Sequence, residues 1–165
     1  METNVINWEK LLLEAFNSTP FGCLATHGDK GVWASPVFFS WDEACNLYFI
    51  SEFETRHMDN ILGNQQVSYA IYPTNQADDV LGLQIVGNAK VLKDQNDIHS
   101  AFSYYFGRIY PGQHPKFGDK IDSPYAYNPD WNFVKITPSE IFMFDTRYFG
   151  EKRVLVPAGT KVPIL

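Results

Sequence analysis

The sequence predicts a mainly β (α+β) protein, a closed or split antiparallel β-barrel of six or seven strands with two or three flanking helices. Short stretches with strand-like alternation of apolar and polar residues recur from residue 21 to residue 144. Most are separated by tight turns rich in Gly, Asp and Asn. Helical spacing appears in only three places. Closure removes exposed sheet edges, which favours a barrel, and the length suits one domain over residues 1–165.

Three segments carry the helical pattern. Residues 5–16 place apolar side chains on one face and end at a run of turn formers. Residues 55–63 form a short second helix, with Thr55 as the N-cap and Gly63 as the C-cap. Asp94 caps a third helix, whose aromatic face would cover one end of the barrel.

Seven segments read as strands, over residues 21–26, 32–41, 47–51, 67–72, 83–92, 131–137 and 141–144. Gly87 predicts a bulge or tight bend inside its strand. A turn at 138–140 is expected to separate the last two strands. Residues 107–130 contain four prolines among polar and aromatic residues, which indicates an ordered, irregular loop that could serve as a lid.

Composition and charge exclude several classes of protein. The net charge is −6 and Lys and Arg form no cluster, whereas a nucleic-acid partner requires a basic stripe. No apolar stretch is long enough to span a bilayer, and the first residues lack a secretory signal. We therefore expect a cytoplasmic protein with no membrane contact. Cys23 and Cys45 lack disulfide or metal-ligand spacing, so we interpret both as small buried hydrophobic residues and expect no metal.

Pro36 marks an irregular place in the second expected strand. Proline has no backbone N–H, so this strand lies at a sheet edge or is locally broken. Unpaired backbone groups beside Pro36 could then bind a planar heterocycle that carries carbonyls and ring N–H groups. A proline on an ordinary unpaired edge explains the same pattern.

The segment 51–57 predicts a phosphate site. It runs from a strand end into the short helix, and a helix start offers unpaired N–H groups and partial positive charge. Arg56 adds a fork of donors suited to phosphate oxygens, and the Thr55 hydroxyl could donate as well. His57 would be a second cation if a bound dianion raised its pKa. The alternative is that Arg56 is an ordinary solvated charge on a helix face.

Together these two signals and their surroundings resemble the pyridoxamine 5'-phosphate oxidase-like FMN-binding split-barrel proteins. The resemblance covers residues 20–93 well and is weaker beyond them. It is carried by Gly22-Cys23-Leu24-Ala25-Thr26, Trp33-Ala34-Ser35-Pro36-Val37-Phe38, Leu47-Tyr48-Phe49-Ile50-Ser51, Thr55-Arg56-His57-Met58-Asp59-Asn60-Ile61, Gln66-Val67-Ser68-Tyr69-Ala70-Ile71 and Gly82-Leu83-Gln84-Ile85-Val86-Gly87-Asn88-Ala89. It implies a split barrel and a homodimer with two flavins at the interface.

The resemblance also implies a role for each part of the FMN site. The flavin ring would lie along backbone groups of one strand, the phosphate at the helix start, and a neighbouring long strand would approach both. Residue by residue, Ser35, Pro36, Val37 and Phe38 would line the ring, Ile50 and Ser51 would touch the ring and ribityl chain, Thr55, Arg56 and His57 would hold the phosphate, and Gly82 and Gln84 would come from the long strand. Many relatives have Lys where this chain has His57, so we expect a weaker or pH-sensitive phosphate site.

This chain departs from the oxidase that makes pyridoxal phosphate. That enzyme carries a basic residue at the end of its second strand and an arginine-rich motif near its C-terminus, whereas Phe39 and Ser40 stand here and the closing stretch is Val-Pro-Ile-Leu. We therefore do not expect vitamin B6 as the substrate. Arg147, Lys152 and Arg153 could cross the dimer to meet the phosphate or substrate, or they could belong to a solvated hairpin.

Three functions are compatible with these features. The first is a flavin-dependent oxidoreductase that passes a hydride or electrons from reduced FMN to a small organic acceptor, with NADH or NADPH as the reductant. The second is a non-enzymatic dimer that carries flavin or haem as a store or sensor. The third is an interaction module without a cofactor. Substrate-pocket walls, or plain core packing, are expected from Tyr104, Tyr105, Tyr110 and Trp131, whereas His99 and His114 read as surface histidines, with a haem-ligand role for His114 as the alternative.

Overall fold

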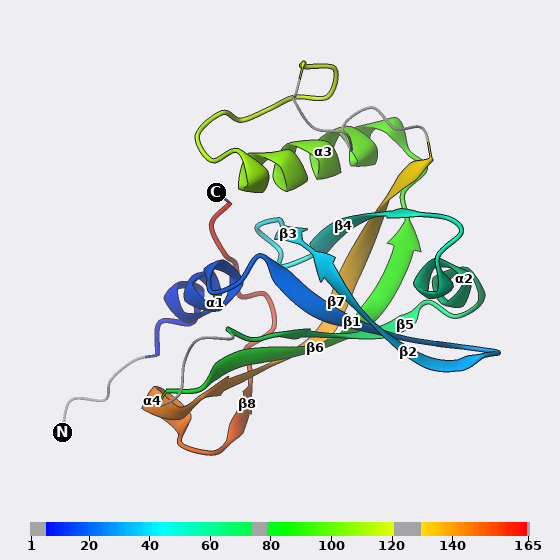
Figure 1. The fold of residues 1–165 in the computed structure, drawn as a ribbon. Helices are drawn as coiled ribbons and strands as arrows, with labels where there is room; N and C mark the ends of the chain where they lie inside the picture. Colours follow the sequence, from blue (N-terminus) through cyan, green and yellow to red (C-terminus); the bar gives the residue numbers. More distant parts are fainter. Residues whose placement is uncertain (1–5, 74–78, 121–129, 165) are drawn as a thin grey trace.

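The chain folds around a curled antiparallel sheet in a computed structural model that describes residues 6–73, 79–120 and 130–164 (Figure 1). Within these residues the main path through the sheet is β2-β1-β5-β6-β7-β4-β3, and β8 pairs with β7. The strands are β1 Phe21–Gly28, β2 Gly31–Phe38, β3 Ser40–Trp41, β4 Leu47–Glu52, β5 Gln66–Ile71, β6 Leu81–Val91, β7 Trp131–Asp145 and β8 Arg153–Leu155. This arrangement confirms the predicted mainly β split barrel.

A bulge between β6 and β7 gives the sheet its sharp bend. Val86 pairs with Glu140 and Gly87 pairs with Pro138, so Ser139 has no partner in the register. A Cβ atom on Gly87 would lie 2.4 Å from the Thr137 carbonyl oxygen, which leaves room only for glycine. The bend expected at Gly87 is confirmed. The turn expected at 138–140 was wrong, because β7 continues through it as one strand.

Strict alternation on β6 decides which face of the sheet is the core. Every second residue of β6 is buried, Leu83, Ile85 and Ala89 among them, and the residues that alternate with these are exposed or half-buried. In the register of the sheet, Leu24, Tyr69 and Ile85 stand in one row across β1, β5 and β6, and all three belong to the main core. The opposite face of these strands points outward.

Four helices flank the sheet in the described residues: α1 Trp8–Asn17, α2 Arg56–Gly63, α3 Gln95–Ile109 and α4 Thr146–Phe149. The Asp94 carboxylate accepts hydrogen bonds from two backbone N–H groups at the start of α3, which confirms its capping role. Gly63 was expected as the C-cap of α2, but it is the last helical residue and Asn64 follows in extended conformation. None of the helices in this part of the chain is both long and apolar enough to cross a bilayer.

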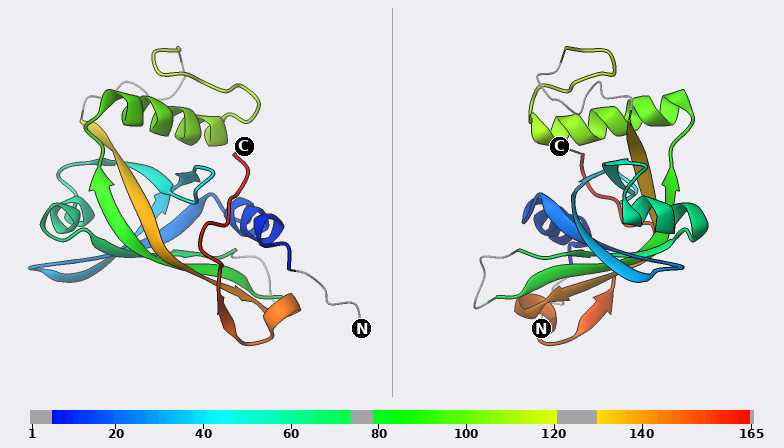
Figure 2. Two further views of the ribbon diagram at one scale, coloured as in Figure 1. Left: turned by 180° about the vertical axis from the view of Figure 1, so that it is seen from behind. Right: turned by 45° about the vertical axis from the view of Figure 1, so that its right-hand side comes forward.

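Helix α3 lies across one end of the barrel (Figures 1 and 2). Its buried Phe102, Tyr105 and Phe106 pack against Ile50 of β4, with Phe133 of β7 beside them. Because α3 continues to Ile109, the irregular segment predicted from residue 107 begins later; its residues 110–120 form turns, and 121–129 lie outside the described residues.

The segment after β8 runs back past the barrel towards α3 (Figure 2). The Trp41 indole N–H donates to the Pro163 carbonyl at 3.0 Å, and the Val162 N–H donates to the Glu43 carbonyl at 3.0 Å. This segment also helps to bury Cys45, whose thiol donates to the Thr160 carbonyl. Burial raises the pKa of Cys45 to about 11, so this thiol is unreactive, as expected for a buried cysteine. Cys23 is only half-buried.

Candidate functional site at the start of helix α2

Strand β2 lies beside the start of α2, and one of the two alternatives predicted for it, the sheet edge, is present. It is the last strand at one end of the sheet and pairs only with β1 among the described strands. Its ladder stops at Phe38, and the chain resumes as β3 at Ser40. The edge position predicted from Pro36 is therefore confirmed, whereas the ladder continues through Pro36, which pairs with Cys23, and the interruption of the strand lies after Phe38.

Three hydroxyl side chains surround the ring of His57, and we call this group the hydroxyl cluster: Ser35, Ser51 and Thr55. Ser35 Oγ lies 3.2 Å from Nδ1 of the ring. On the other side Ser51 Oγ lies 2.7 Å and Thr55 Oγ1 3.2 Å from Nε2. Residues from β2, β4 and the loop before α2 thus meet at one imidazole, which brings together four of the residues predicted for the site.

Burial sets the charge of His57 in this cluster. Loss of contact with water lowers its pKa from the usual 6.5, so the imidazole is neutral at pH 7. The Phe49 ring lies edge-on to it at 6.1 Å and adds to the apolar surroundings. The predicted second cation is therefore uncharged in the chain as it stands.

Arg56 points to another side of the helix start. Its Nη2 donates to the Lys30 carbonyl in the β1–β2 turn, and its guanidinium carbon lies 4.5 Å from the centre of the Trp33 ring. Its Nε is buried and has no hydrogen-bond partner in the part of the chain that the structure describes. Arg56 also lines a polar cavity of about 620 Å³ between this turn and α2, together with Lys30 and Asn60.

The first turn of α2 lacks a side-chain cap. Thr55 occupies the N-cap position as predicted, but its hydroxyl makes no capping hydrogen bond. It donates instead to the Glu52 carbonyl at 3.1 Å. The first N–H groups of α2 therefore remain available to an acceptor from outside the helix.

The other predicted ring contacts lie on both sides of β2. Pro36 is exposed and faces outward, whereas the Val37 carbonyl accepts a hydrogen bond from the Tyr69 hydroxyl at 3.0 Å. Phe38 packs edge-on against Tyr105 of α3 at 5.0 Å, and Ile50 lies buried in the same cluster. One part of β2 is thus held by contacts with the core, and another part is exposed to solvent.

Gly82 and Gln84 are not brought to the hydroxyl cluster by their own chain. Strands β1 and β5 separate β6 from β2. Gln84 shares the outward row of Pro36, through Cys23 on β1 and Ala70 on β5. It accepts a hydrogen bond from Nε of Arg153 at 3.1 Å. Within one chain these two predicted residues therefore lie apart from the hydroxyl cluster.

The C-terminal cations are largely engaged elsewhere. Arg147 binds the buried Asp145 carboxylate at 2.7 Å and Glu14 at 2.6 Å. The Arg153 guanidinium lies over Phe144 at 4.9 Å, on the outward face of the sheet. Lys152 is exposed in the turn before β8. The alternative that was expected, a solvated hairpin, agrees with the structure, because β8 pairs antiparallel with the end of β7 and the connection between them contains the one-turn helix α4.

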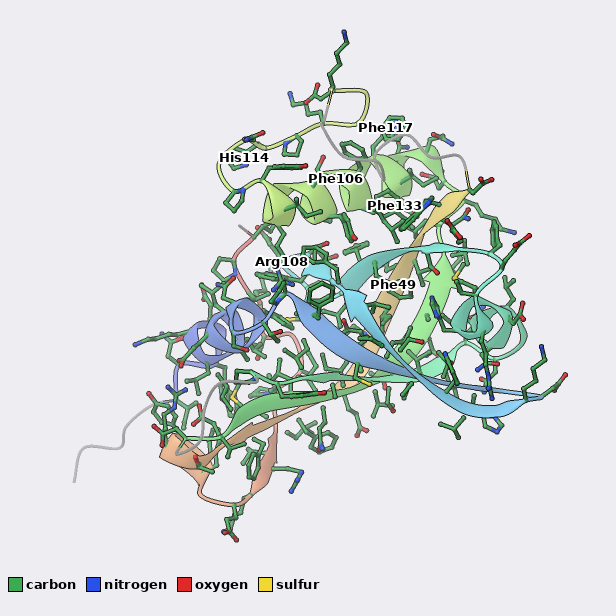
Figure 3. The ribbon with its side chains drawn as sticks, in the orientation of Figure 1. Phe49, Phe106, Arg108, His114, Phe117 and Phe133 are labelled. Atoms are coloured by element: carbon green, nitrogen blue, oxygen red, sulfur yellow. The ribbon has the colours of Figure 1, made fainter. Side chains whose placement is uncertain are left out.

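The residues predicted as pocket walls or haem ligands lie around α3. Tyr104 packs on Tyr48 at 5.3 Å, and Tyr105, Tyr110 and Trp131 belong to the aromatic cluster under α3. His99 stacks on Phe117 at 4.4 Å. Figure 3 shows His114 and Phe117 on the segment that runs above α3. None of these residues contacts the hydroxyl cluster in the described contacts.

One half-buried arginine of the barrel end was not identified from the sequence. Arg108 of α3 donates to the carbonyls of Phe39, Phe16 and Thr19, and it lies over the rings of Phe39 and Trp41 at 4.1 and 4.6 Å. Figure 3 shows it between α3 and the barrel strands. It fixes the break between β2 and β3 and so positions the end of β2. A single Arg among aromatics at the end of a helical pattern gave no signal of this role.

Comparison with known proteins identifies the family to which the chain belongs. The profile of the family described as Pyridoxamine 5'-phosphate oxidase matches residues 9–145. None of the curated proteins matches the chain significantly. Among the solved structures that share the fold is a conserved hypothetical protein from Mycobacterium tuberculosis, with 18% identity, a TM-score of 0.68, and 97% of this chain and 98% of that chain covered. A pyridoxamine 5'-phosphate oxidase-related, FMN binding protein from Nostoc punctiforme has 17% identity and a TM-score of 0.65, with 92% of this chain and 91% of that chain covered. A heme binding protein from Mycobacterium smegmatis has 14% identity and a TM-score of 0.68, with 94% of this chain and 60% of that chain covered.

At these identities the structures establish the fold alone, whereas the family profile spans most of the chain. The profile covers β1 to β7, and with them every residue of the hydroxyl cluster, Arg56 and the interrupted edge of β2. The chain therefore belongs to the pyridoxamine 5'-phosphate oxidase-like split-barrel family.

Proposed function

We propose that this protein binds FMN at the start of α2 and uses it as a flavin-dependent oxidoreductase on a small organic acceptor. The observation that carries the proposal is the contact between the two predicted halves of the site. Ser35 on the interrupted strand lies 3.2 Å from the ring of His57 at the helix start. A single ligand can therefore reach unpaired backbone beside Pro36 and the uncapped N-terminus of α2.

The chemistry of the lining suits the three parts of FMN. Free backbone groups of β2 can bind the carbonyls and N–H of the ring, and the hydroxyl of Ser51 can bind a ribityl hydroxyl. Arg56, Thr55 and the first N–H groups of α2 can bind the phosphate. When bound, FMN supplies the hydride and electron transfer, and the chain supplies position and hydrogen bonds.

The outward face of the sheet favours a homodimer that completes this site. Small side chains stand in adjacent rows there, Ala34, Ala25 and Ser68 in one and Cys23 and Ala70 in the next. Ala25 and Ser68 of the first row, together with Val86, which is 42% exposed, line a groove of about 370 Å³. Small side chains allow a second sheet to approach closely, and a second copy would bring the face of Gly82 and Gln84 to the ring.

Haem binding is less well supported by the described histidines. Both ring nitrogens of His57 face hydroxyl groups, and His99 is stacked on Phe117. The relative that is named as a heme binding protein shares 14% identity with this chain. Haem uptake by colourless protein, with a Soret band lost in His114→Ala, would replace the flavin proposal.

The absorption spectrum of the purified protein tests the proposal directly. We expect flavin absorbance near one equivalent per chain, or stoichiometric uptake of added FMN, and the mass of a dimer by light scattering. Oxidation of NADH or NADPH with a nitro compound or quinone as acceptor would support the enzyme over a flavin store. Protein that takes up no flavin would exclude both flavin functions, the oxidoreductase and the store, and leave the interaction module.

Replacement of Arg56 separates phosphate binding from ring binding. Arg56→Ala should weaken FMN binding by about 2 kcal/mol, the typical value of a hydrogen bond to a charged group, and leave riboflavin binding unchanged. Lys30→Ala is the matched control, since only the backbone carbonyl of Lys30 contacts Arg56. Equal FMN affinity in Arg56→Ala and the wild type would remove this arginine from the site.

A further inference from the structure

We propose that His57 selects phosphorylated flavins by taking up a proton when the phosphate binds. This inference rests on the proposed FMN site and assigns the second cation of that site. It follows from the groups that surround the ring, from the charges near it and from its place at the helix start.

The hydroxyl cluster can accommodate both charge states of the ring without losing a hydrogen bond. A neutral imidazole has one donor and one acceptor nitrogen, whereas the imidazolium has two donors. Ser35 at Nδ1 and Ser51 at Nε2 can each donate or accept by rotating the hydroxyl. Protonation of His57 therefore costs only the burial of the charge, not a hydrogen bond.

No carboxylate compensates that charge in the described structure. The elements packed on the ring bring Ser35 from β2, Phe49 and Ser51 from β4, and Thr55 from the preceding loop, and none of these is ionisable near pH 7. The nearby charged residues of the sequence are Glu52, Glu54, Arg56 and Asp59. None of these four has a hydrogen bond or ion pair to the ring among the contacts of the described residues.

The site therefore lacks an anion until a ligand supplies one. Before binding, burial and the positive end of α2 both disfavour the imidazolium. A phosphate dianion at the helix start would reverse this balance, because an opposite charge within about 4–6 Å favours the charged form. Proton uptake and phosphate binding are then linked, and each strengthens the other.

The linkage between proton uptake and phosphate binding predicts that the binding affinity depends on pH for phosphorylated ligands only. A shift of one pKa unit changes the affinity by at most about tenfold, so between pH 8.5 and 6.5 FMN should bind more tightly by up to about tenfold. In this window the phosphate itself remains largely dianionic, since its second pKa is about 6. Riboflavin lacks the phosphate and should bind with the same affinity throughout.

Fluorescence titrations of FMN and riboflavin test this in the wild type, in His57→Gln, which cannot be charged, and in His57→Lys, which stays charged. We expect the pH dependence of FMN binding in the wild type alone, with weak binding in His57→Gln and tight binding in His57→Lys at every pH. A wild-type profile that matches His57→Gln would overturn the inference and leave the FMN site intact. Failure of FMN to bind at any pH would overturn both.

A second measurement needs no variant. In the wild-type protein, the imidazole nitrogen resonances of His57 should titrate at higher pH when FMN is present than when riboflavin is present. A titration midpoint that is the same with the two ligands would also overturn the inference, even if a substituted chain failed to fold.

Discussion

Two arginines near the two ends of β2 are held in very different ways, Arg56 at the β1–β2 turn and Arg108 at the break between β2 and β3. Arg108 donates to three carbonyls and lies against aromatic rings, so its hydrogen-bonding capacity is largely used inside the molecule. Arg56 has one carbonyl and one ring, and its buried Nε has no partner among the described residues. The comparison separates a cation that holds the fold from a cation that has capacity left for a ligand.

The N-terminal ends of the two helices that carry these arginines, α3 for Arg108 and α2 for Arg56, show the same contrast. Asp94 satisfies two N–H groups at the start of α3. Thr55 satisfies none at the start of α2. Since unsatisfied donors cost stability unless a partner is supplied, an anion at the start of α2 would stabilise the chain more than one at the start of α3.

The largest expected effect is that of Arg108→Met. It leaves the carbonyls of the buried Phe16 and Phe39 and of the half-buried Thr19 without this donor, and we expect a loss of about 3–5 kcal/mol of unfolding free energy, as for a broken buried polar network. Urea unfolding measures it. Arg56→Met is the matched control and should change stability by less than about 1 kcal/mol. Equal losses in the two variants would remove the distinction between the arginines.

The next effect concerns the bulge that bends the sheet. Gly87→Ala places a methyl group 2.4 Å from the Thr137 carbonyl oxygen, and relief of that contact requires a backbone shift that costs about 1–3 kcal/mol. Gly63→Ala, at the end of α2 with nothing within 4 Å, should be neutral or stabilising by up to about 1 kcal/mol. Thermal unfolding of both variants checks this, and an unaffected Gly87→Ala protein would show that the bulge is not tightly packed.

Much of the fold could be predicted from local patterns. Alternation located the main strands, Asp94 marked a helix start, and Pro36 and Gly87 marked an edge and a bend, because each of these features acts through its own backbone. The continuation of β7 through Pro138 was missed. A proline beside a bulge needs no ladder N–H, and only the pairing with β6 reveals that.

The site was predictable where its residues are close in sequence and not where they meet from afar. Ser51, Thr55 and His57 are close in sequence, and the short connection from strand β4 to helix α2 brings their side chains together. Arg108 binds carbonyls that are 69 to 92 positions away, so no local pattern could indicate them. Gln84 lies on another strand of the outward face, and only the order of the strands shows that its own chain keeps it apart from the hydroxyl cluster.

A smaller effect distinguishes the two helix starts. Asp94→Ala should cost about 1 kcal/mol of stability through loss of a cap. Thr55→Ala removes no cap, so it should cost less in the unliganded protein and instead reduce FMN affinity relative to riboflavin. Urea unfolding and flavin titration separate the two. A larger stability loss for Thr55→Ala than for Asp94→Ala would mean that the hydroxyl cluster is structural.

The smallest effect is the pH dependence of the unliganded protein. Burial lowers the pKa of His57 in the folded state, so below about pH 6.5 the unfolded chain binds a proton that the folded chain does not. Stability is therefore complete above pH 6.5 and decreases as the pH falls through that value. His57→Gln should lose this component of the profile. Saturating FMN should reverse its sign in the wild type, because the bound phosphate makes the folded state the one that holds the proton.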